Sequence, residues 1–489
     1  MRYEKGDPRV LNRMKKGYPR FFIASESAML FLSLLAAEQC VVFIRDQPVA
    51  GFQGRVRKAA SQDAMSRIPE AHVTIYCVFF LENLFSLSKQ YSQHTGNGIS
   101  PCLAECCMRI ENANDECKQE AGLHQRILSG TGASAPEQGE SAGSELEVFT
   151  YVEERFGRNF DPKYAAEMKL ALRHCIAGAL TEGEEKHRTQ VQRGVAGLNT
   201  LKIIEKLGPG AYFLEHGEGS DYEEFKRILK HHALTPEDPI LAIFAECLSN
   251  SLLKTTDFPC LRELAIRFKV ALVVDETIGN FANIDVLSYA DIVVSSLTKV
   301  FSGDSNVMGG SIVLTPNSRF YMPVCLAVHV TTEDIIWCKN AIFPERNSRD
   351  FVRRVNEING NALAVAELLQ ASPKVANVWY PKFTIPSNYD KIKRLSYATG
   401  YGGLISVTFV SGKHGSWAFY DSLLCCKGPS LGTNFTLALL YTHFAHFTKL
   451  EWAAQYGVDA NLVRISIGFE PCEDLLAMFQ TSLKAIPDN

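Results

Sequence analysis

Ala271-Leu272-Val273-Val274-Asp275 and Asp291-Ile292-Val293-Val294 are two short apolar runs, each of a length that suits a buried strand of a parallel sheet. The second run leads directly into Ser295-Ser296-Leu297-Thr298-Lys299. In parallel α/β sheets, ligand-binding groups gather beyond the carboxyl ends of the strands. The sequence therefore predicts an α/β fold in which Asp275 and Lys299 lie at one crevice.

The residues at this crevice match the needs of pyridoxal phosphate. That cofactor requires an amine for a Schiff base, an anion beside its ring nitrogen and donors for its phosphate. Lys299, Asp275 and the hydroxyl groups of Ser296 and Thr298 supply these in turn. Taken separately, a Ser-x-Thr-Lys tetrad is more often a surface turn and an acid after a strand is more often a cap. Their order, spacing and strand context favour the cofactor site.

Longer motifs give the chain a resemblance to a known family. The densest are VDETIGNFAN (274–283), YADIVVSSLTK (289–299) and FSGDSNVMGG (301–310). They resemble the cystathionine γ-synthase branch of the Cys/Met-metabolism pyridoxal-phosphate enzymes, and its fungal form in particular. The likeness covers most of the chain and extends to GPSLGTNFTL (428–437), ANLVRISIG (460–468), EERFGRN (153–159), GYPRFF (17–22) and QHTGNGIS (93–100).

The resemblance implies a fold-type I pyridoxal-phosphate-dependent transferase. Its large domain would hold a mostly parallel sheet, followed by a smaller C-terminal α/β domain and preceded by an N-terminal extension. No metal is implied. The implied site residues are Lys299 as the Schiff-base lysine and proton carrier, Asp275 at the pyridine nitrogen, Ser296 and Thr298 at the phosphate, Asn250 near the ring hydroxyl, Arg155 at the phosphate of a neighbouring subunit, and Arg464 with Ser430 at the substrate α-carboxylate.

One part of the chain departs from the family pattern. In the family, a stretch of several tens of residues carries backbone phosphate donors, including a Ser/Thr-Gly-Met turn. Here residues 180–193 are short, charged and dissimilar, and Gly197 stands near the expected place of a ring-stacking tyrosine. The family's prolines around Asn250 are replaced by Leu248 and Ser251. The loss of a stacked aromatic ring and of phosphate donors predicts weaker cofactor binding.

Composition excludes several other classes of protein. The chain has 489 residues, of which 46% are hydrophobic, and a net charge of −4. It carries no basic stripe, which argues against a nucleic-acid partner. The apolar run at 28–37 is too short for a bilayer and is expected to form a core helix. The N-terminus shows no apolar signal segment, so we expect a cytoplasmic protein without membrane contact.

The cysteines and two histidines are the candidates for a metal site. The fourteen cysteines are scattered and include no Cys-x-x-Cys pair. Cys102, Cys106 and Cys107 suit one helix face better than a tetrahedral zinc site, and reduced buried thiols are the favoured reading. His443 and His446 lack an accompanying carboxylate motif, so we expect packed histidines there.

Strand and helix patterns predict how the chain is divided into domains. Residues 128–143 are rich in Gly and Ser and are expected to form a flexible linker. Before the linker, the strand-like runs 41–44 and 73–80 carry no recognisable chemistry. After it, strands such as 240–244 alternate with helices such as 260–268, and 404–409 is expected as a strand of a smaller domain. The expected divisions are 1–127 for the N-terminal extension, 128–148 for the linker, 149–358 for the cofactor-binding domain and 359–489 for the small domain.

Three functions are compatible with the sequence. The leading one is γ-replacement on an activated homoserine ester by a thiol such as cysteine, in a homodimer or homotetramer with shared active sites. The second is homoserine-ester sulfhydrylation or γ-elimination, because the same cofactor supports these reactions and specificity depends on a few pocket side chains. The third is a catalytically impaired relative that acts as a binding protein, for which the missing phosphate segment is the main argument.

Overall fold

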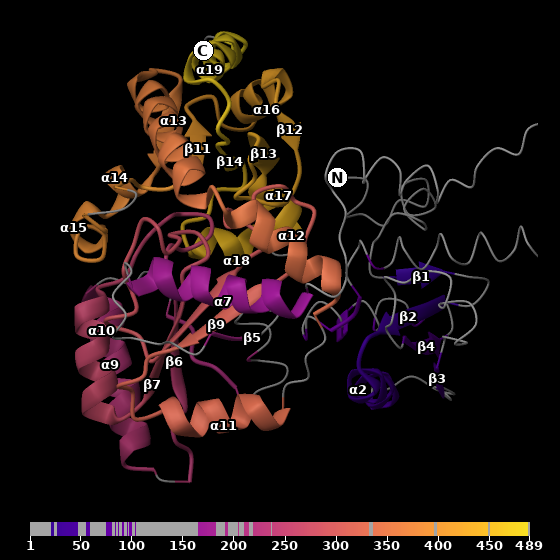
Figure 1. Ribbon diagram of the computed structural model, residues 1–489. Helices are drawn as coiled ribbons and strands as arrows, with labels where there is room; N and C mark the ends of the chain where they lie inside the picture. Colours follow the sequence, from indigo (N-terminus) through magenta and orange to yellow (C-terminus); the bar gives the residue numbers. More distant parts are fainter. Residues whose placement is uncertain are drawn as a thin grey trace, which may run out of the picture.

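The computed structural model describes residues 165–181, 191–193, 210–214, 219–235, 237–331, 336–395, 399–447 and 450–487, together with 21–23, 27–46, 55–58, 75–80, residue 204 and single residues between 84 and 103. These residues form three sheets with surrounding helices. Figure 1 shows the small C-terminal domain above the larger one, with the N-terminal sheet to one side.

The sheet of the large domain has the strand order β5-β9-β8-β7-β6. Strands β6 (Ala242–Glu246), β7 (Ala271–Asp275) and β8 (Ile292–Ser296) are parallel. Strand β9 (Gly310–Leu314) is antiparallel both to β8 and to β5 (Val191–Arg193). The structure thus confirms the predicted α/β fold, and β7 and β8 are the two apolar runs from which it was predicted.

A buried carboxylate fixes the start of β8 beside β7. Asp291 is 3% exposed and accepts hydrogen bonds from the backbone N–H of Leu272 at 2.8 Å and from the hydroxyl of Ser318 at 2.6 Å. Arg262 on the neighbouring helix donates to the same carboxylate at 2.9 Å. Because a buried charge must be paired, these contacts fix the register of the two strands that lead to the predicted site.

Helices cover the sheet, and one of them shows clear end signals. Helix α10 (Phe258–Phe268) begins at Asp257, whose side chain accepts from the N–H of Cys260, and ends at Lys269 in the left-handed conformation. Its buried residues, including Leu261 and Leu264, lie on one face, as expected of an amphipathic helix. The other helices of this domain are α7 (Ala165–Thr181), α9 (Gly219–Ala233), α11 (Tyr321–Thr331) and α12 (Cys338–Ser348).

Strand β6 is the outermost described strand of this sheet. No strand of the described segments pairs with its outer edge, and Phe244 within it remains 49% exposed. Parallel strands are usually covered on both faces. Between β5 and α9 the structure describes only residue 204 and residues 210–214.

The small domain has its own sheet and core. Its strand order is β10-β11-β14-β13-β12, with β12 parallel to β13 and the other pairs antiparallel. The predicted strand 404–409 is β11, and all six of its residues are buried. The strands are β10 (Val375–Trp379), β11 (Leu404–Phe409), β12 (Cys426–Lys427), β13 (Leu437–Leu440) and β14 (Val463–Ser466).

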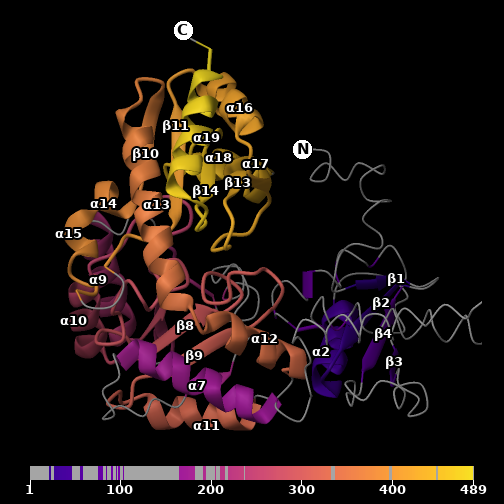
Figure 2. The ribbon, with the colours of Figure 1, turned by 45° about the horizontal axis from the view of Figure 1, so that its top comes forward.

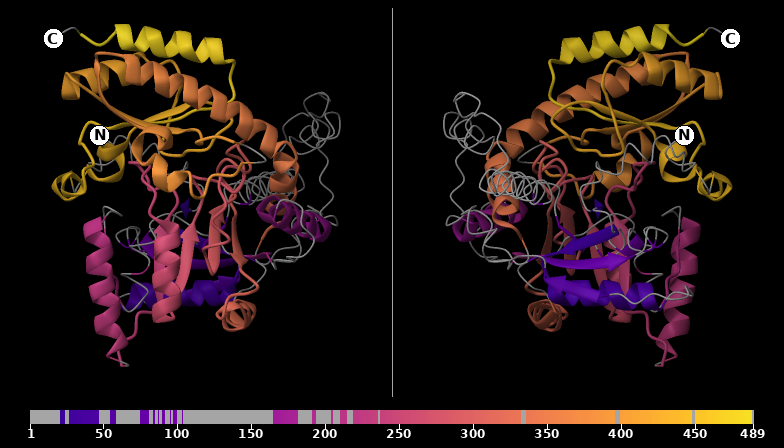
Figure 3. Two further views of the ribbon diagram at one scale, coloured as in Figure 1. Left: turned by 90° about the vertical axis from the view of Figure 1, so that its left-hand side faces the viewer. Right: turned by 90° about the vertical axis from the view of Figure 1, so that its right-hand side faces the viewer.

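Helix α13 (Phe351–Ala371) extends between the two domains (Figure 2). Its first residue, Phe351, belongs to the core of the large domain, whereas Val365 and Leu369 belong to that of the small domain. The proposed boundary at 358/359 therefore falls inside this helix. Figure 3 shows α13 alongside α19 (Cys472–Lys484) on one side of the small sheet. The remaining helices are α14 (Pro381–Thr384), α15 (Pro386–Tyr389), α16 (Gly412–Ser422), α17 (Tyr441–Ala445) and α18 (Leu450–Gln455).

The N-terminal sheet corrects two of the predictions. Its antiparallel order is β1 (Phe21–Ile23), β2 (Ser27–Phe31), β4 (Tyr76–Phe80) and β3 (Arg55–Lys58). The run 41–44, predicted as a strand, lies in helix α2 (Leu34–Arg45), which begins where the Ser33 hydroxyl accepts from the N–H of Ala36 at 3.1 Å. The run 28–37, predicted as one helix, is divided between β2 and α2.

Several predictions fall outside what the structure describes, and others concern histidines, cysteines and membrane spans. The linker 128–148, Arg155, Gly197, Cys102, Cys106 and Cys107 lie outside the described residues. His443 packs edge-on against Trp417, and His446 lies between Tyr441 and Trp452. Within the described segments no three metal-binding side chains cluster, and no helix has the length and apolar character needed to cross a membrane.

Candidate active site

Lys299 lies just beyond the carboxyl end of β8, in a turn closed by a hydrogen bond from Gly303 N–H to the Lys299 carbonyl oxygen at 2.8 Å. Its Nζ donates to the hydroxyl of Ser430 at 3.0 Å. Burial, together with the charge of Arg464, lowers the pKa of Lys299 to about 8. Near neutral pH, this amine is therefore far more readily deprotonated than an ordinary lysine.

Arg464, on β14, lies on the other side of Ser430. Its guanidinium donates to the carbonyl oxygens of Pro429 and Ser430 at 2.7 and 3.0 Å and to Asn250 Oδ1 at 2.9 Å. Arg464 is 3% exposed, and burial lowers its pKa to about 10, which leaves it charged at neutral pH. No acidic side chain of the described residues forms an ion pair with it. A buried cation of this kind is suited to bind an anion.

Asn250 connects Arg464 to the acidic side of the site. Besides accepting from Arg464, it donates its backbone N–H to Glu246 Oε2 at 3.3 Å, and its carbonyl oxygen accepts from the Tyr441 hydroxyl at 3.4 Å. The guanidinium of Arg464 also lies 4.9 Å from the centre of the Tyr441 ring. These contacts fix the orientation of the guanidinium.

Glu246 and Asp275 end adjacent strands and are paired in the register of β6 and β7. Burial, together with the charge of Asp275, raises the pKa of Glu246 to about 7. Burial also raises the pKa of Asp275, while hydrogen bonds from Thr277 lower it, including one from the Thr277 N–H at 3.0 Å. A cation placed beside Asp275 would offset this burial cost, as a protonated pyridine nitrogen does.

Ser296 and Thr298 are placed by their backbone and by local hydrogen bonds. The N–H of Ser296 donates to the Thr277 hydroxyl at 2.9 Å, which connects β8 to the segment after Asp275. The Thr298 hydroxyl accepts from Gly309 N–H at 3.1 Å and donates to the Gly309 carbonyl oxygen at 3.4 Å. The Thr298 hydroxyl is thus bonded to the backbone of Gly309, directly before β9.

Seven of the eight residues singled out from the sequence thus belong to one connected region. Contacts run from Lys299 through Ser430, Arg464 and Asn250 to Glu246, which lies beside Asp275, and Ser296 and Thr298 flank the lysine. The eighth, Arg155, lies outside the described residues. The arrangement fits pyridoxal phosphate through its amine, its ring-nitrogen anion and its hydroxyl groups near the lysine.

Sequence reasoning missed three residues of this region. Glu246 follows an apolar run, as Asp275 does, so the rule that selected Asp275 would have found it as well. Thr277 and Tyr441 had no such signal, because each acts through contacts between segments distant in sequence. Tyr441, for example, lies 191 residues from its partner Asn250.

The fold and the lysine site define an α/β protein of the pyridoxal-phosphate type. Residues 217–484 match the family model of Cys/Met metabolism PLP-dependent enzymes, and residues 10–100 match that of the fungal trans-sulfuration enzyme N-terminal domain. The chain therefore belongs to the Cys/Met metabolism family of pyridoxal-phosphate-dependent enzymes, as its sequence motifs predict.

Individual relatives agree with this assignment. The chain is 36% identical to a cystathionine γ-synthase of Neurospora crassa, with 99% of this chain and 94% of the relative covered. It is 30% identical to a cystathionine γ-synthase of Saccharomyces cerevisiae, with coverage of 99% and 94%. Among solved structures, a cystathionine γ-synthase of Xanthomonas oryzae in complex with aminoacrylate and cysteine superposes with a TM-score of 0.51 at 26% identity, covering 58% of this chain and 71% of that one.

The alignment with one relative also shows a difference in length. The alignment with the Neurospora crassa protein extends over 599 positions, whereas this chain has 489 residues, so more than one hundred positions of the relative have no counterpart here. The sequence motifs predict part of that difference at residues 180–193.

Proposed function

We propose that this enzyme replaces the γ-substituent of an activated homoserine ester with a thiol such as cysteine, giving cystathionine. The observation that carries the proposal is the position of Ser430 between Lys299 and Arg464. The Ser430 hydroxyl accepts from Lys299 Nζ at 3.0 Å, and the Ser430 carbonyl oxygen accepts from Arg464 at 3.0 Å. An amino acid at this place would have its carboxylate on Arg464 and its α-carbon near Lys299. The names of the fungal relatives support the choice of reaction.

Each residue has a separate task in this proposal. Asp275 would hold the ring nitrogen, Asn250 would serve the ring hydroxyl, and Ser296 would donate to the phosphate. Thr298 would do so by exchanging its 3.4 Å bond to the Gly309 carbonyl oxygen for a bond to the phosphate. When bound, pyridoxal phosphate supplies an electron sink for the bonds around the α-carbon. The planar guanidinium of Arg464 orients the substrate carboxylate by paired hydrogen bonds, assisted by Ser430.

Lys299 moves the protons. Its lowered pKa makes the neutral amine accessible near neutral pH, which suits a group that must take a proton from the substrate and return it. Ser430 accepts the hydrogen bond from Nζ and orients the amine toward the bound amino acid.

The assembly and the compartment belong to the same proposal. Arg155 is assigned to the phosphate of a neighbouring subunit, which requires a homodimer or homotetramer with shared active sites. We place the enzyme in the cytoplasm. No disulfide joins two of the described cysteines, which suits a reducing compartment.

A labelling experiment tests the cofactor assignment. Full-length protein incubated with pyridoxal phosphate should turn yellow, and borohydride reduction should leave a pyridoxyl group on Lys299, located by peptide mass spectrometry. Lys427 is a suitable control, because it lies in the same domain as Ser430 and its ammonium is also hydrogen-bonded, but to the carbonyl oxygens of Tyr420 and Leu423. A Lys427→Ala variant should label normally, and a Lys299→Ala variant should not.

Product analysis then separates the candidate reactions. With an activated homoserine ester and cysteine, we expect cystathionine. Formation of homocysteine from the ester and sulfide, without reaction with cysteine, would indicate a sulfhydrylase. Release of a 2-oxo acid in the absence of any thiol would indicate a γ-lyase. An unlabelled Lys299 with no product would exclude all three and leave a binding protein.

A further inference from the structure

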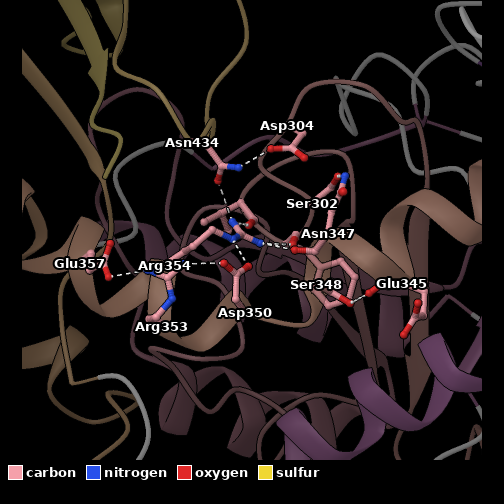
Figure 4. Close-up of polar contacts among 12 residues, drawn as sticks. Ser302, Asp304, Glu345, Asn347, Ser348, Asp350, Arg353, Arg354, Glu357 and Asn434 are labelled. Atoms are coloured by element: carbon pink, nitrogen blue, oxygen red, sulfur yellow. Dashed lines mark hydrogen bonds and ion pairs between the residues drawn. The ribbon is translucent and has the colours of Figure 1, made fainter. Parts of the chain in front are cut away.

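A single buried guanidinium connects the turn that carries Lys299 to the small domain. We call residues 299–303 the lysine turn and residues 428–436, which include Ser430, the substrate loop. Arg354 belongs to the second turn of α13, and its side chain is 3% exposed. Figure 4 shows its guanidinium at the centre of a group of polar side chains from several segments.

All five N–H donors of Arg354 have acceptors. Two go to the lysine turn, where the carbonyl oxygens of Val300 and Phe301 accept at 3.0 and 2.8 Å. One goes to Asn434 Oδ1 of the substrate loop at 2.9 Å. The others go to α13 and the end of α12, where Asp350 Oδ1 and the Asn347 carbonyl oxygen accept at 2.7 and 2.8 Å.

Asn434 is also bonded directly to the lysine turn and to the residue that follows it. Its backbone N–H donates to the Gly303 carbonyl oxygen at 2.8 Å, and its side-chain amide donates to Asp304. The charged groups around the junction are Arg354 and Asp350, with Asp304 and Arg353 at its exposed rim. The positive charge of Arg354 is therefore balanced locally by Asp350.

The two backbones are in direct contact. A Cβ added to Gly303 would overlap the Asn434 side chain, and one added to Gly432 would lie 2.6 Å from the backbone nitrogen of Val300 and 3.1 Å from the Lys299 Cβ. Because interiors are close-packed, a displacement of the substrate loop necessarily alters the surroundings of Lys299.

We propose that Arg354, acting through Asn434, is a positioning residue that holds Ser430 against Lys299 and thereby sets the proton affinity of the lysine and the shape of the carboxylate pocket. The identity of the substrate in this inference rests on the proposed function. The effect on the position and proton affinity of Lys299 does not depend on it. Arg354 contacts neither reacting group. Its effect is transmitted by the substrate loop, whose Pro429 and Ser430 carbonyl oxygens also orient Arg464.

Asn434→Ala is the most informative variant, because it removes one of the five bonds of Arg354, together with the amide bond to the exposed Asp304, and leaves the other four bonds of Arg354 in place. Loosening the substrate loop would expose Lys299 to water and move Arg464 away from it, and both changes favour the charged amine. We expect the midpoint for acylation of Lys299, followed by mass spectrometry against pH in full-length protein without added cofactor, to rise by about one pH unit. The KM for an activated homoserine ester should rise about tenfold.

Arg353→Gln is the matched control. Arg353 precedes Arg354 in α13, its side chain is 59% exposed, and it pairs with Asp350 and Glu357 at the surface. The Arg353→Gln variant should leave the acylation midpoint of Lys299 and the KM for the homoserine ester unchanged. Arg354→Lys should resemble Asn434→Ala, since an ammonium cannot reproduce five planar donors. Thermal unfolding shows whether each variant folds. If Arg354→Lys does not fold, the result for Asn434→Ala alone decides whether the positioning role holds.

The outcomes also separate this inference from the proposed function. A shifted lysine midpoint without any cystathionine formation would support the positioning contact and contradict the proposed reaction. An unchanged midpoint in folded Asn434→Ala would overturn the positioning role, whatever the enzyme makes.

Discussion

Glu246 shows how a single carboxyl group responds to its position in this site. It lies between the backbone of Asn250 and the Asp275 carboxylate, and its raised pKa keeps it largely protonated in mildly acidic solution. Burial raises the pKa of both carboxyl groups, and hydrogen bonds oppose that rise, from Thr277 at Asp275 and from the backbone of Asn250 at Glu246.

The raised pKa predicts how stability depends on pH. Between the ordinary value of 4.5 and about 7, the folded chain keeps a proton on Glu246 that the unfolded chain releases. The free energy of unfolding therefore falls as pH rises through this window, by roughly 3 kcal/mol in all. The Glu246→Gln variant should not show this fall in the free energy of unfolding, because its amide does not titrate. Without added cofactor, the variant should match the wild type below pH 4.5 and exceed it above pH 7 in denaturant unfolding. A constant difference across the whole pH range would contradict this account.

Arg464 gives a second prediction for a single residue. Replacement by Ala removes the proposed carboxylate anchor and should raise the KM for amino-acid substrates by about 100-fold, as expected for charge-assisted hydrogen bonds. It should also raise the pKa of Lys299, because the neighbouring cation that lowers it is lost. Pyridoxyl labelling of Lys299 should persist. An unchanged KM would show that another residue holds the carboxylate.

At the scale of elements, the accuracy of sequence-based prediction depended on burial. Strand β11, buried along its whole length, was predicted with its observed bounds, and β7 was recognised from four consecutive apolar residues. The run 41–44 was misassigned because its β-branched residues suit a strand. In the structure, Cys40, Val41 and Ile44 lie on the buried face of α2, and this helical spacing of apolar residues outweighs the local preference.

Three phenylalanines stabilise the elements that carry the lysine turn. Phe281, Phe301 and Phe351 have ring centres 5.1 to 5.6 Å apart and join the segment after β7, the lysine turn and the start of α13. Phe351→Ala should cost about 3–5 kcal/mol through the cavity it leaves, and Phe351→Leu about 1.5 kcal/mol or less. Denaturant midpoints measure both. Phe244→Ala is the control, because that side chain is 49% exposed and its loss should change the midpoint little.

At the scale of the whole molecule, the site is built from two domains. The large domain contributes Lys299, Asp275 and Asn250, and the small domain contributes Ser430 and Arg464. Sequence motifs identified these residues but not the contacts between them, because Arg464 and Asn250 are 214 residues apart in the chain. Such pairs follow from the packing of one domain on the other, which local patterns do not contain. The resemblance to the family supplied what periodicity alone did not.

Arg155 extends the same reasoning to the assembly. If it completes the phosphate site of a neighbouring subunit, it should matter more here than in relatives with a longer phosphate-binding segment, because fewer local donors remain. The alternative is that Glu153, Glu154 and Arg155 form a charged, solvated start of a helix, since charges commonly gather at helix ends. Arg155→Ala would then have little effect on cofactor binding.

Mixing two inactive variants distinguishes these alternatives. In a shared site, a hybrid of an Arg155→Ala chain and a Lys299→Ala chain contains one site with both changes and one site with neither. Activity should therefore return after subunit exchange, toward a quarter of the wild-type value in a random mixture of dimers, because about half of the dimers are hybrids and each has one intact site of two. Exchange is verified independently by native mass spectrometry of isotope-labelled chains. If exchange is complete and the mixture remains as inactive as its parents, each subunit binds its phosphate alone and Arg155 belongs to the surface.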